Sequence, residues 1–153
     1  MPKVPAGVRG AVITGWGAAL PDQVVTNHDL ERTLDTTDDW IAERTGIKER
    51  RVGGSTAELS VTAGRMAIER AGLQPGDIDG LILATTTPDR AVPATSATVQ
   101  HALGLTCGAF DLNAACSGWV YGLVNAHGLI ALGAEKVLVI GTDTLARITD
   151  WSD

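Results

Sequence analysis

The hydrophobic pattern of the chain contains two runs in which apolar residues follow one another without polar alternation. They occupy residues 81–87 and 136–142. Strands of a parallel sheet are covered on both faces, so they tend to be apolar at nearly every position. Shorter apolar stretches lie at 10–19 and 109–112, and the pattern therefore predicts four strands.

Segments with a helical spacing of apolar residues separate these strands. The predicted helices cover residues 38–45, 57–71, 95–103 and 116–133. Threonine at 36 or 37 is a suitable N-cap for the first of them, and a glycine ends the second and the third. Asn27 is expected to cap a further short helix that reaches residue 34. The alternation of strands and helices predicts an α/β fold with a mostly parallel sheet and helices on both faces.

The helix at 116–133 is apolar nearly all round, which predicts burial between two layers. Its glycines at 118, 122 and 128 lower the helix propensity of the segment. A second helix that packs closely against them would explain their presence.

Cys116 is the strongest candidate for chemistry. It follows the strand at 109–112 and lies in the first turn of the long helix, within the run Asn-Ala-Ala-Cys-Ser-Gly at 113–118. A helix N-terminus offers unpaired backbone N–H groups and about half a positive charge, which favour a thiolate and lower the pKa of a cysteine. Small neighbours leave room for an electrophile and for N–H groups that face an oxyanion, as acyl transfer to a thiol requires. The alternative is a small buried hydrophobic residue, which is how we interpret Cys107.

Composition restricts the partners and the compartment. The 153 residues are 44% hydrophobic, enough for a core, and carry a net charge of -6, which argues against nucleic-acid binding. The two cysteines lack the spacing of a zinc site or of a disulfide framework. The N-terminal residues lack the apolar core of a signal peptide, and no run approaches the roughly 18 apolar residues of a membrane span. We expect an intracellular, cytoplasmic protein without a metal site.

A basic cluster follows Trp40 in this acidic chain. Trp40 and Arg44 are four positions apart and project from one face of the predicted helix. Together with Lys48, Arg50 and Arg51 they suit a flat, anionic ligand such as the adenine and phosphates of coenzyme A. The alternative is a half-buried tryptophan beside a solvated face with ion pairs.

Two motifs resemble one known family. They are the run at 113–118 and Asp-Trp-Ile-Ala-Glu-Arg-Thr-Gly-Ile-Lys-Glu-Arg at 39–50, which lie in the order and at about the spacing found in β-ketoacyl-acyl-carrier-protein synthase III, a thiolase-like condensing enzyme family. The resemblance implies a thiolase-like fold with two duplicated halves. Residues 1–153 would form the N-terminal half, truncated before the last strand of its sheet, with the C-terminal domain absent. Such a chain should expose a strand edge and the apolar face of its long helix, and should be unstable or aggregate alone.

The resemblance also implies roles for particular residues. Cys116 matches the family's nucleophile, which takes an acyl group from acyl-coenzyme A and condenses it with malonyl carrier protein to a 3-oxoacyl product. Trp40 and Arg44 match residues at the mouth of the coenzyme A tunnel, and Thr36 matches a position beside them. No cofactor is implied beyond acyl-coenzyme A as substrate, and the catalytic histidine and asparagine belong to the second half.

In the family, the loop at 88–95 crosses the interface of a homodimer. Val92 matches a residue there that helps to close the partner's acyl pocket. Several family members have phenylalanine at this position, so valine predicts tolerance of primers longer or more branched than acetyl.

Two alternatives stay open. A polyketide starter-unit ketosynthase, or an acyltransferase that esterifies, has the same fold and differs mainly in the second half. A non-catalytic module would use Cys116 for packing and residues 88–103 for dimerisation. The histidines match no catalytic pattern of the family and are interpreted as structural or surface residues: His28, His101 and His127.

Overall fold

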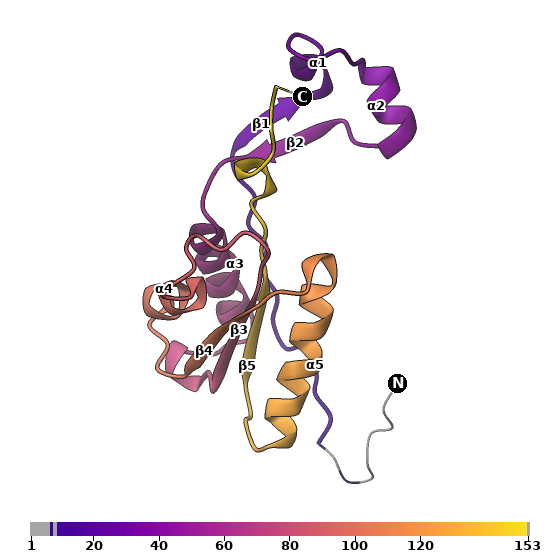
Figure 1. Ribbon diagram of the computed structural model, residues 1–153. Helices are drawn as coiled ribbons and strands as arrows, with labels where there is room; N and C mark the ends of the chain where they lie inside the picture. The colour runs from indigo at the N-terminus through magenta and orange to yellow at the C-terminus, as the bar shows by residue number, and fades with distance from the viewer. Residues whose placement is uncertain (1–6, 8, 153) are drawn as a thin grey trace. The chain divides into compact units, whose positions relative to one another are not determined.

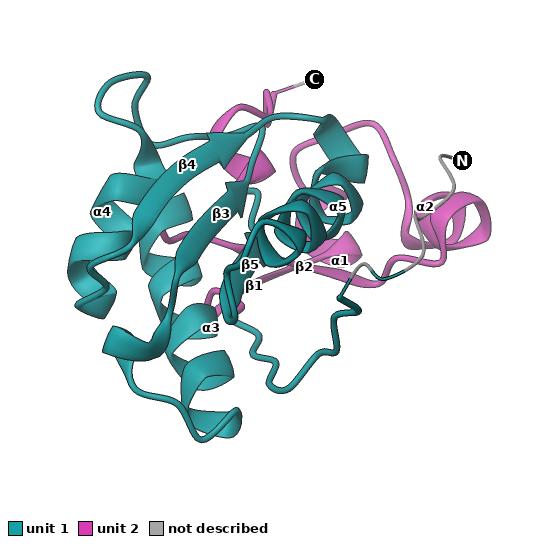
Figure 2. Ribbon diagram, turned by 90° about the horizontal axis from the view of Figure 1, so that it is seen from below, with its two compact units in different colours: residues 1–19, 56–143 teal, residues 20–55, 144–153 magenta. Residues whose placement is uncertain are grey.

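The computed structural model describes residue 7 and residues 9–152. The chain forms two compact units (Figure 2). The first comprises Met1–Ala19 and Thr56–Asp143, and the second Leu20–Ser55 and Thr144–Asp153. Cys116 belongs to the first unit, whereas Trp40 and Arg44 belong to the second.

A parallel three-stranded sheet forms the centre of the first unit (Figure 1). Its strands are β3 (Gly80–Ala84), β4 (Gly108–Leu112) and β5 (Val137–Gly141), in the order β4-β3-β5. Both pairs are parallel, as the uninterrupted apolar runs predicted. Every residue of the central strand β3 is buried.

Helices cover both faces of this sheet, which confirms the predicted layering (Figure 1). The helices α3 (Thr56–Arg70) and α4 (Thr95–Leu103) lie on one face, and α5 (Gly118–Ala131) lies on the other. The predicted bounds of α4 are those observed.

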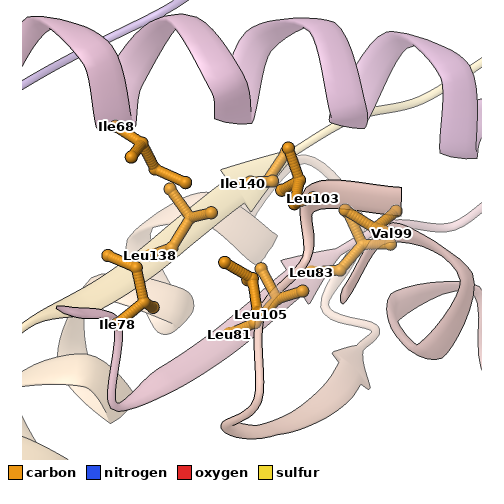
Figure 3. Packing of buried hydrophobic residues seen from close by; sticks show 9 residues of the cluster. All are labelled: Ile68, Ile78, Leu81, Leu83, Val99, Leu103, Leu105, Leu138 and Ile140. Atoms are coloured by element: carbon orange, nitrogen blue, oxygen red, sulfur yellow. The ribbon is translucent and has the colours of Figure 1, made fainter. Parts of the chain in front are cut away.

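Successive residues of β3 and β5 point to opposite faces and so meet different helices. Leu81, Leu83, Leu138 and Ile140 join α3 and α4 in the main core cluster (Figure 3). On the other face, Ile82 and Val139 lie next to Gly122 of α5. The sheet is therefore fixed to helices through both of its faces.

The helix α5 differs from its prediction in two respects. It begins at Gly118, because residues Ala115–Ser117 form a separate 3₁₀ turn. The prediction that this helix is buried between two layers is also wrong for this chain. Gly118, Gly122 and Ala126 are buried against the sheet, but Val120 and Val124 on the outer side are 59% and 64% exposed. This is the exposed apolar face that we expected of half a thiolase-like protein.

The predicted strand at 10–19 is wrong. Residues 9–20 form no strand, and Val12 and Ile13 are exposed. The segment lies on α3 instead: a Cβ on Gly15 would come within 2.2 Å of the carbonyl oxygen of Ala67. Residues 11–17 line a groove of about 690 Å³ together with residues of α3, α5 and β5, and they do not pair with the sheet.

The second unit contains a strand pair that sequence reasoning missed. β1 (Gln23–Thr26) and β2 (Glu49–Val52) are antiparallel, and both are short and partly polar, so they lack a clear strand signal. The helix α1 (Asn27–Leu30) is capped by Thr26, not by Asn27. The helix α2 (Asp38–Thr45) has the predicted bounds and Thr37 as its N-cap.

Asn27 has a different role from the predicted cap. Its side chain is 1% exposed and donates to Asp38 Oδ1 at 2.7 Å and to the carbonyl oxygen of Ile47 at 2.8 Å. Its side-chain oxygen accepts a hydrogen bond from Arg50. One buried amide thus links α1, α2 and β2. Within the described residues of both units, no helix is long and apolar enough to cross a membrane.

The close approach of α5 to the sheet can be tested with two glycines of the same helix. A Cβ on Gly122 would lie 2.8 Å from Val139 Cγ1, whereas a Cβ on Gly128 meets no described atom within 4 Å. Gly128→Ala should stabilise the fold by roughly 0.5–1 kcal/mol through helix propensity. Gly122→Ala gains the same propensity but must displace Val139, so we expect it to be about 2 kcal/mol less stable than Gly128→Ala. Urea denaturation followed by circular dichroism measures the difference, and equal midpoints would contradict the close packing.

Candidate active site

Cys116 lies where a strand passes through a tight turn into a helix. β4 ends at Leu112, the 3₁₀ turn Ala115–Ser117 follows, and α5 starts at Gly118. The carboxyl ends of parallel strands meet at one edge of a sheet, which is where α/β proteins place their ligands. The Cys116 side chain is exposed at this edge. The sequence predicted Cys116 in the first turn of the long helix, whereas the structure places it in the 3₁₀ turn, two residues before α5 begins.

The turn before Cys116 holds a strained residue. Ala115 has a φ of 47°, in the left-handed region that residues with a Cβ rarely occupy. Asn113 Oδ1 accepts a hydrogen bond from Ala115 N at 3.3 Å, and Ser117 N donates to the Ala114 carbonyl oxygen at 3.1 Å. Such a sharp turn between strand and helix presents a nucleophile outward.

Small residues bring the start of α5 against the sheet. A Cβ on Gly118 would lie 3.1 Å from the Cβ of Ala84, the last residue of β3. Trp119 lies over Gly141, the last residue of β5, where a Cβ would be 3.1 Å from Trp119 Cδ1. Cys116 therefore lies beside a helix N-terminus that is fixed to the carboxyl ends of two strands. The free N–H groups of such a terminus stabilise negative charge on a thiolate or an oxyanion.

The loops at this edge are joined by a carboxylate that sequence reasoning missed. Asp143, two residues beyond β5, accepts hydrogen bonds through Oδ1 from the backbone N–H of Thr86 at 2.7 Å and from the Thr85 hydroxyl at 3.2 Å. The available signal was the change from apolar residues to Thr85–Thr87 after β3 and to Thr142 and Asp143 after β5.

Cys107 differs from Cys116 in its surroundings. It precedes β4 at the opposite edge of the sheet and packs against the core cluster. Burial raises the pKa of the Cys107 thiol above its ordinary value. These surroundings agree with a packing role for Cys107.

Val92 lies in the connection between β3 and α4, within the first unit. Its side chain is 86% exposed. No described residue buries it, so its role depends on what the exposed loop meets.

Trp40 and Arg44 form a pair within the second unit. The guanidinium carbon of Arg44 lies 4.4 Å from the centre of the Trp40 ring, and Arg44 Nη1 donates to the Trp40 carbonyl oxygen at 3.4 Å. Trp40 is 53% exposed and Arg44 Nη1 lies 4.0 Å from Glu43 Oε2, so the alternative of a half-buried tryptophan beside ion pairs stays open. The pair presents an aromatic surface and a positive charge side by side.

The basic cluster is smaller than its sequence suggested. Arg50 donates a hydrogen bond to the side-chain oxygen of the buried Asn27, and Arg51 forms an ion pair with Glu49 at 3.3 Å. Thr36 has a buried hydroxyl oxygen for which the described residues supply no hydrogen-bond partner.

Two of the three histidines make specific contacts within their own units. His28 Nδ1 lies 3.0 Å from Glu31 Oε2, and its hydrogen bond to this carboxylate raises the pKa of His28. His127 Nε2 lies 3.0 Å from the carbonyl oxygen of Arg9. These contacts agree with structural or surface roles.

Comparisons with known proteins identify the family. A family model described as 3-Oxoacyl-[acyl-carrier-protein (ACP)] synthase III matches residues 110–153, which include Cys116. The β-ketoacyl-[acyl-carrier-protein] synthase III of Roseiflexus sp. (strain RS-1) is 52% identical over 148 residues, which cover 94% of this chain and 45% of the relative. The chain thus spans about half the length of the curated relatives it matches.

Solved structures agree with this result. The crystal structure of 3-oxoacyl-[acyl-carrier-protein] synthase III from Aquifex aeolicus VF5 superposes with a TM-score of 0.91 at 44% identity, over 94% of this chain and 48% of that one. The priming β-ketosynthase from the R1128 polyketide biosynthetic pathway superposes with a TM-score of 0.87 at 33% identity, over 92% of this chain and 44% of that one. The predicted thiolase-like fold is confirmed, and the chain belongs to the β-ketoacyl-acyl-carrier-protein synthase III family.

Proposed function

We propose that this chain is the N-terminal half of a cytoplasmic acyltransferase that starts fatty-acid synthesis. Cys116 takes an acyl group from acyl-coenzyme A, and the complete protein condenses it with malonyl carrier protein to give a 3-oxoacyl carrier protein. The observation that carries the proposal is an exposed thiol on a strained turn at the carboxyl edge of the sheet, in a chain about half identical to named synthases III.

In the first step, the Cys116 thiolate attacks the carbonyl carbon of the thioester and forms a new carbon–sulfur bond. The backbone N–H of Cys116 and the start of α5 stabilise the negative oxygen of the tetrahedral intermediate. The bond to the coenzyme A sulfur then breaks, and coenzyme A leaves as a thiolate that takes up a proton.

In the second step, malonyl carrier protein loses carbon dioxide and its carbanion attacks the acyl group on Cys116. A 3-oxoacyl carrier protein forms, and the cysteine thiolate is released. The histidine and asparagine that assist this step are supplied by the second half.

Trp40 and Arg44 are proposed to bind the nucleotide end of acyl-coenzyme A. Arg44 lies over the Trp40 ring, and more than half of the tryptophan surface stays accessible for stacking with adenine. The Arg44 guanidinium carries the charge that phosphates require. Thr36, whose hydroxyl oxygen lacks a partner among the described residues, is proposed to adjoin this site.

Val92 is proposed to close the acyl pocket of a second copy in a homodimer. Its 86% exposure leaves the side chain available to another chain. Valine fills less space than phenylalanine, so primers longer or more branched than acetyl should be accepted.

Labelled acyl-coenzyme A tests the proposed function directly. We expect the label on Cys116 when the chain is extended to the length of its relatives, and none on the 153-residue chain alone. Peptide mass mapping locates the label, Cys116→Ser should abolish it, and Cys107→Ser should retain it. Absence of label with acetyl and branched primers, in a folded full-length protein, would contradict acyl transfer.

The coenzyme A site can be tested with a matched pair of tryptophans. Arg70 lies 4.2 Å from the centre of the Trp16 ring in the first unit and donates to the Trp16 carbonyl oxygen, much as Arg44 does at Trp40. Trp40→Ala should raise the KM for acyl-coenzyme A about fivefold, because one stacking surface is lost. Trp16→Ala serves as the control and should leave KM unchanged. Equal effects of the two variants would remove Trp40 from the binding site.

A polyketide starter-unit ketosynthase is the second candidate, because a priming β-ketosynthase of that kind shares the fold at 33% identity. An esterifying acyltransferase is a related possibility of the same fold. The products formed from acylated protein and malonyl carrier protein distinguish them: a carbon–carbon bond marks a ketosynthase, and an ester marks the acyltransferase. The primer that reacts fastest separates fatty-acid from polyketide initiation.

Alkylation distinguishes catalysis from a non-catalytic module. Cys116 is exposed, whereas burial raises the pKa of Cys107 and lowers its thiolate fraction. Iodoacetamide at pH 8 should therefore modify Cys116 on the order of tenfold faster than Cys107. Mass spectrometry of the two peptides over time gives both rates. Modification of Cys107 at the same rate would favour the non-catalytic interpretation.

A further inference from the structure

The connection between β3 and α4 has an exposed tip and fixed ends. Val92 is at the tip and is 86% exposed, whereas Thr95 and Ser96 at the start of α4 are 1% and 0% exposed. The hydrogen bonds at the two ends explain this difference.

The first end is held by Asp89. Its carboxylate accepts hydrogen bonds from the backbone N–H groups of Thr56 at 3.1 Å and Ala57 at 2.8 Å, in the first turn of α3. The backbone N–H of Asp89 donates to the Thr95 hydroxyl at 2.9 Å. This last bond closes the loop at its base, between residues 89 and 95.

The second end is held by Asp111, which lies on β4. Asp111 Oδ2 accepts from the backbone N–H of Thr95 at 3.0 Å, and Oδ1 accepts from that of Ser96 at 2.7 Å. A carboxylate at a helix N-terminus is a strong acceptor, because the N–H groups there lack other partners and carry partial positive charge. Both oxygens are used, so the start of α4 is fixed in direction as well as in distance.

Asp111 also lies close to Cys116 along the chain. It is paired in register with Leu83 in the central strand and comes five residues before Cys116. The strand β4, which leads into the turn of Cys116, and the loop that carries Val92 are therefore joined by two hydrogen bonds through one side chain.

We propose that Asp111 is a positioning residue for Val92 and so sets the acyl-chain selectivity of transfer to Cys116 of the second copy in a homodimer, with Asp89 as its counterpart at the other end of the loop. This rests on the proposed function, in which Val92 closes the acyl pocket of the second copy. When the hydrogen bonds from Thr95 and Ser96 to Asp111 are weakened, the tip of the loop is no longer fixed relative to β4. Discrimination between short and branched acyl groups then falls. The rate with a small primer changes less, because a small acyl group does not depend on the pocket boundary.

Asp79 provides a matched control. It accepts hydrogen bonds from the backbone N–H groups of Glu135 at 2.7 Å and Lys136 at 2.9 Å, at the opposite edge of the same sheet. Substitution by asparagine removes a charged acceptor of two N–H groups in either case. Asp79→Asn and Asp111→Asn should therefore lose similar stability.

The experiment compares full-length protein carrying either substitution. Acylation of Cys116 is followed with acetyl-coenzyme A and with a branched acyl-coenzyme A, and the ratio of the two kcat/KM values is measured. Asp111→Asn should change this ratio about fivefold, whereas Asp79→Asn should leave it within about twofold. An unchanged ratio in folded Asp111→Asn would overturn the proposal. If this variant does not fold, Asp89→Asn should change the ratio in the same direction, and no change there overturns it equally.

Hydrogen exchange separates this inference from the proposed function. Amide exchange of residues 90–96 should become about tenfold faster in Asp111→Asn than in Asp79→Asn, because the loop loses its anchor. If the unaltered protein takes no acyl group, the proposed function is wrong. If these amides exchange equally fast in Asp111→Asn and Asp79→Asn, the role of Asp111 is wrong, whatever the outcome of acylation.

Discussion

The burial of β3 on both faces is the constraint on which the rest of the structure depends. A strand that is apolar at every position needs a layer on each side, and here α3 and α4 supply one while α5 supplies the other. Gly118 and Gly122 have no side chains, so α5 can pack closely against the sheet and cover this face of β3. The start of α5, and with it the turn that carries Cys116, has its position because the central strand must be covered.

The polar residues and the candidate nucleophile lie at the carboxyl edge of the sheet, because every strand of a parallel sheet ends there. β4 leads into the strained turn at Ala115, while β3 and β5 end in hydroxyl and carboxylate residues that bind one another through Asp143. The same edge holds the loop of Val92 between Asp89 and Asp111. Hydrogen-bonded polar residues thus lie at the edge of the sheet where the Cys116 thiol is exposed, an arrangement that suits the covalent catalysis we propose.

Local signals in the sequence predicted the elements with the strongest periodicity or capping. The helices at 38–45 and 95–103 have the expected bounds, since Thr37 caps the first and a glycine in the left-handed region ends each. The strand predicted at 10–19 does not form. The composition of this segment is typical of a strand, but composition does not decide whether a partner strand lies beside it. The prediction missed the short strands β1 and β2, because their backbones pair although many of their side chains are polar.

The sequence by itself determined the fold class and pointed to Cys116 as the candidate nucleophile. Long apolar runs specify a doubly covered sheet, and a cysteine among small residues at a strand–helix junction is a local pattern. Only the tertiary structure decided which polar groups meet, because those partners are far apart along the chain. Asn27 bonds with Asp38 and Arg50, and Asp111 with Thr95, across separations of 11 to 23 residues. Buried hydrogen-bonding groups must find partners in space, and no spacing rule along the sequence specifies which ones they find.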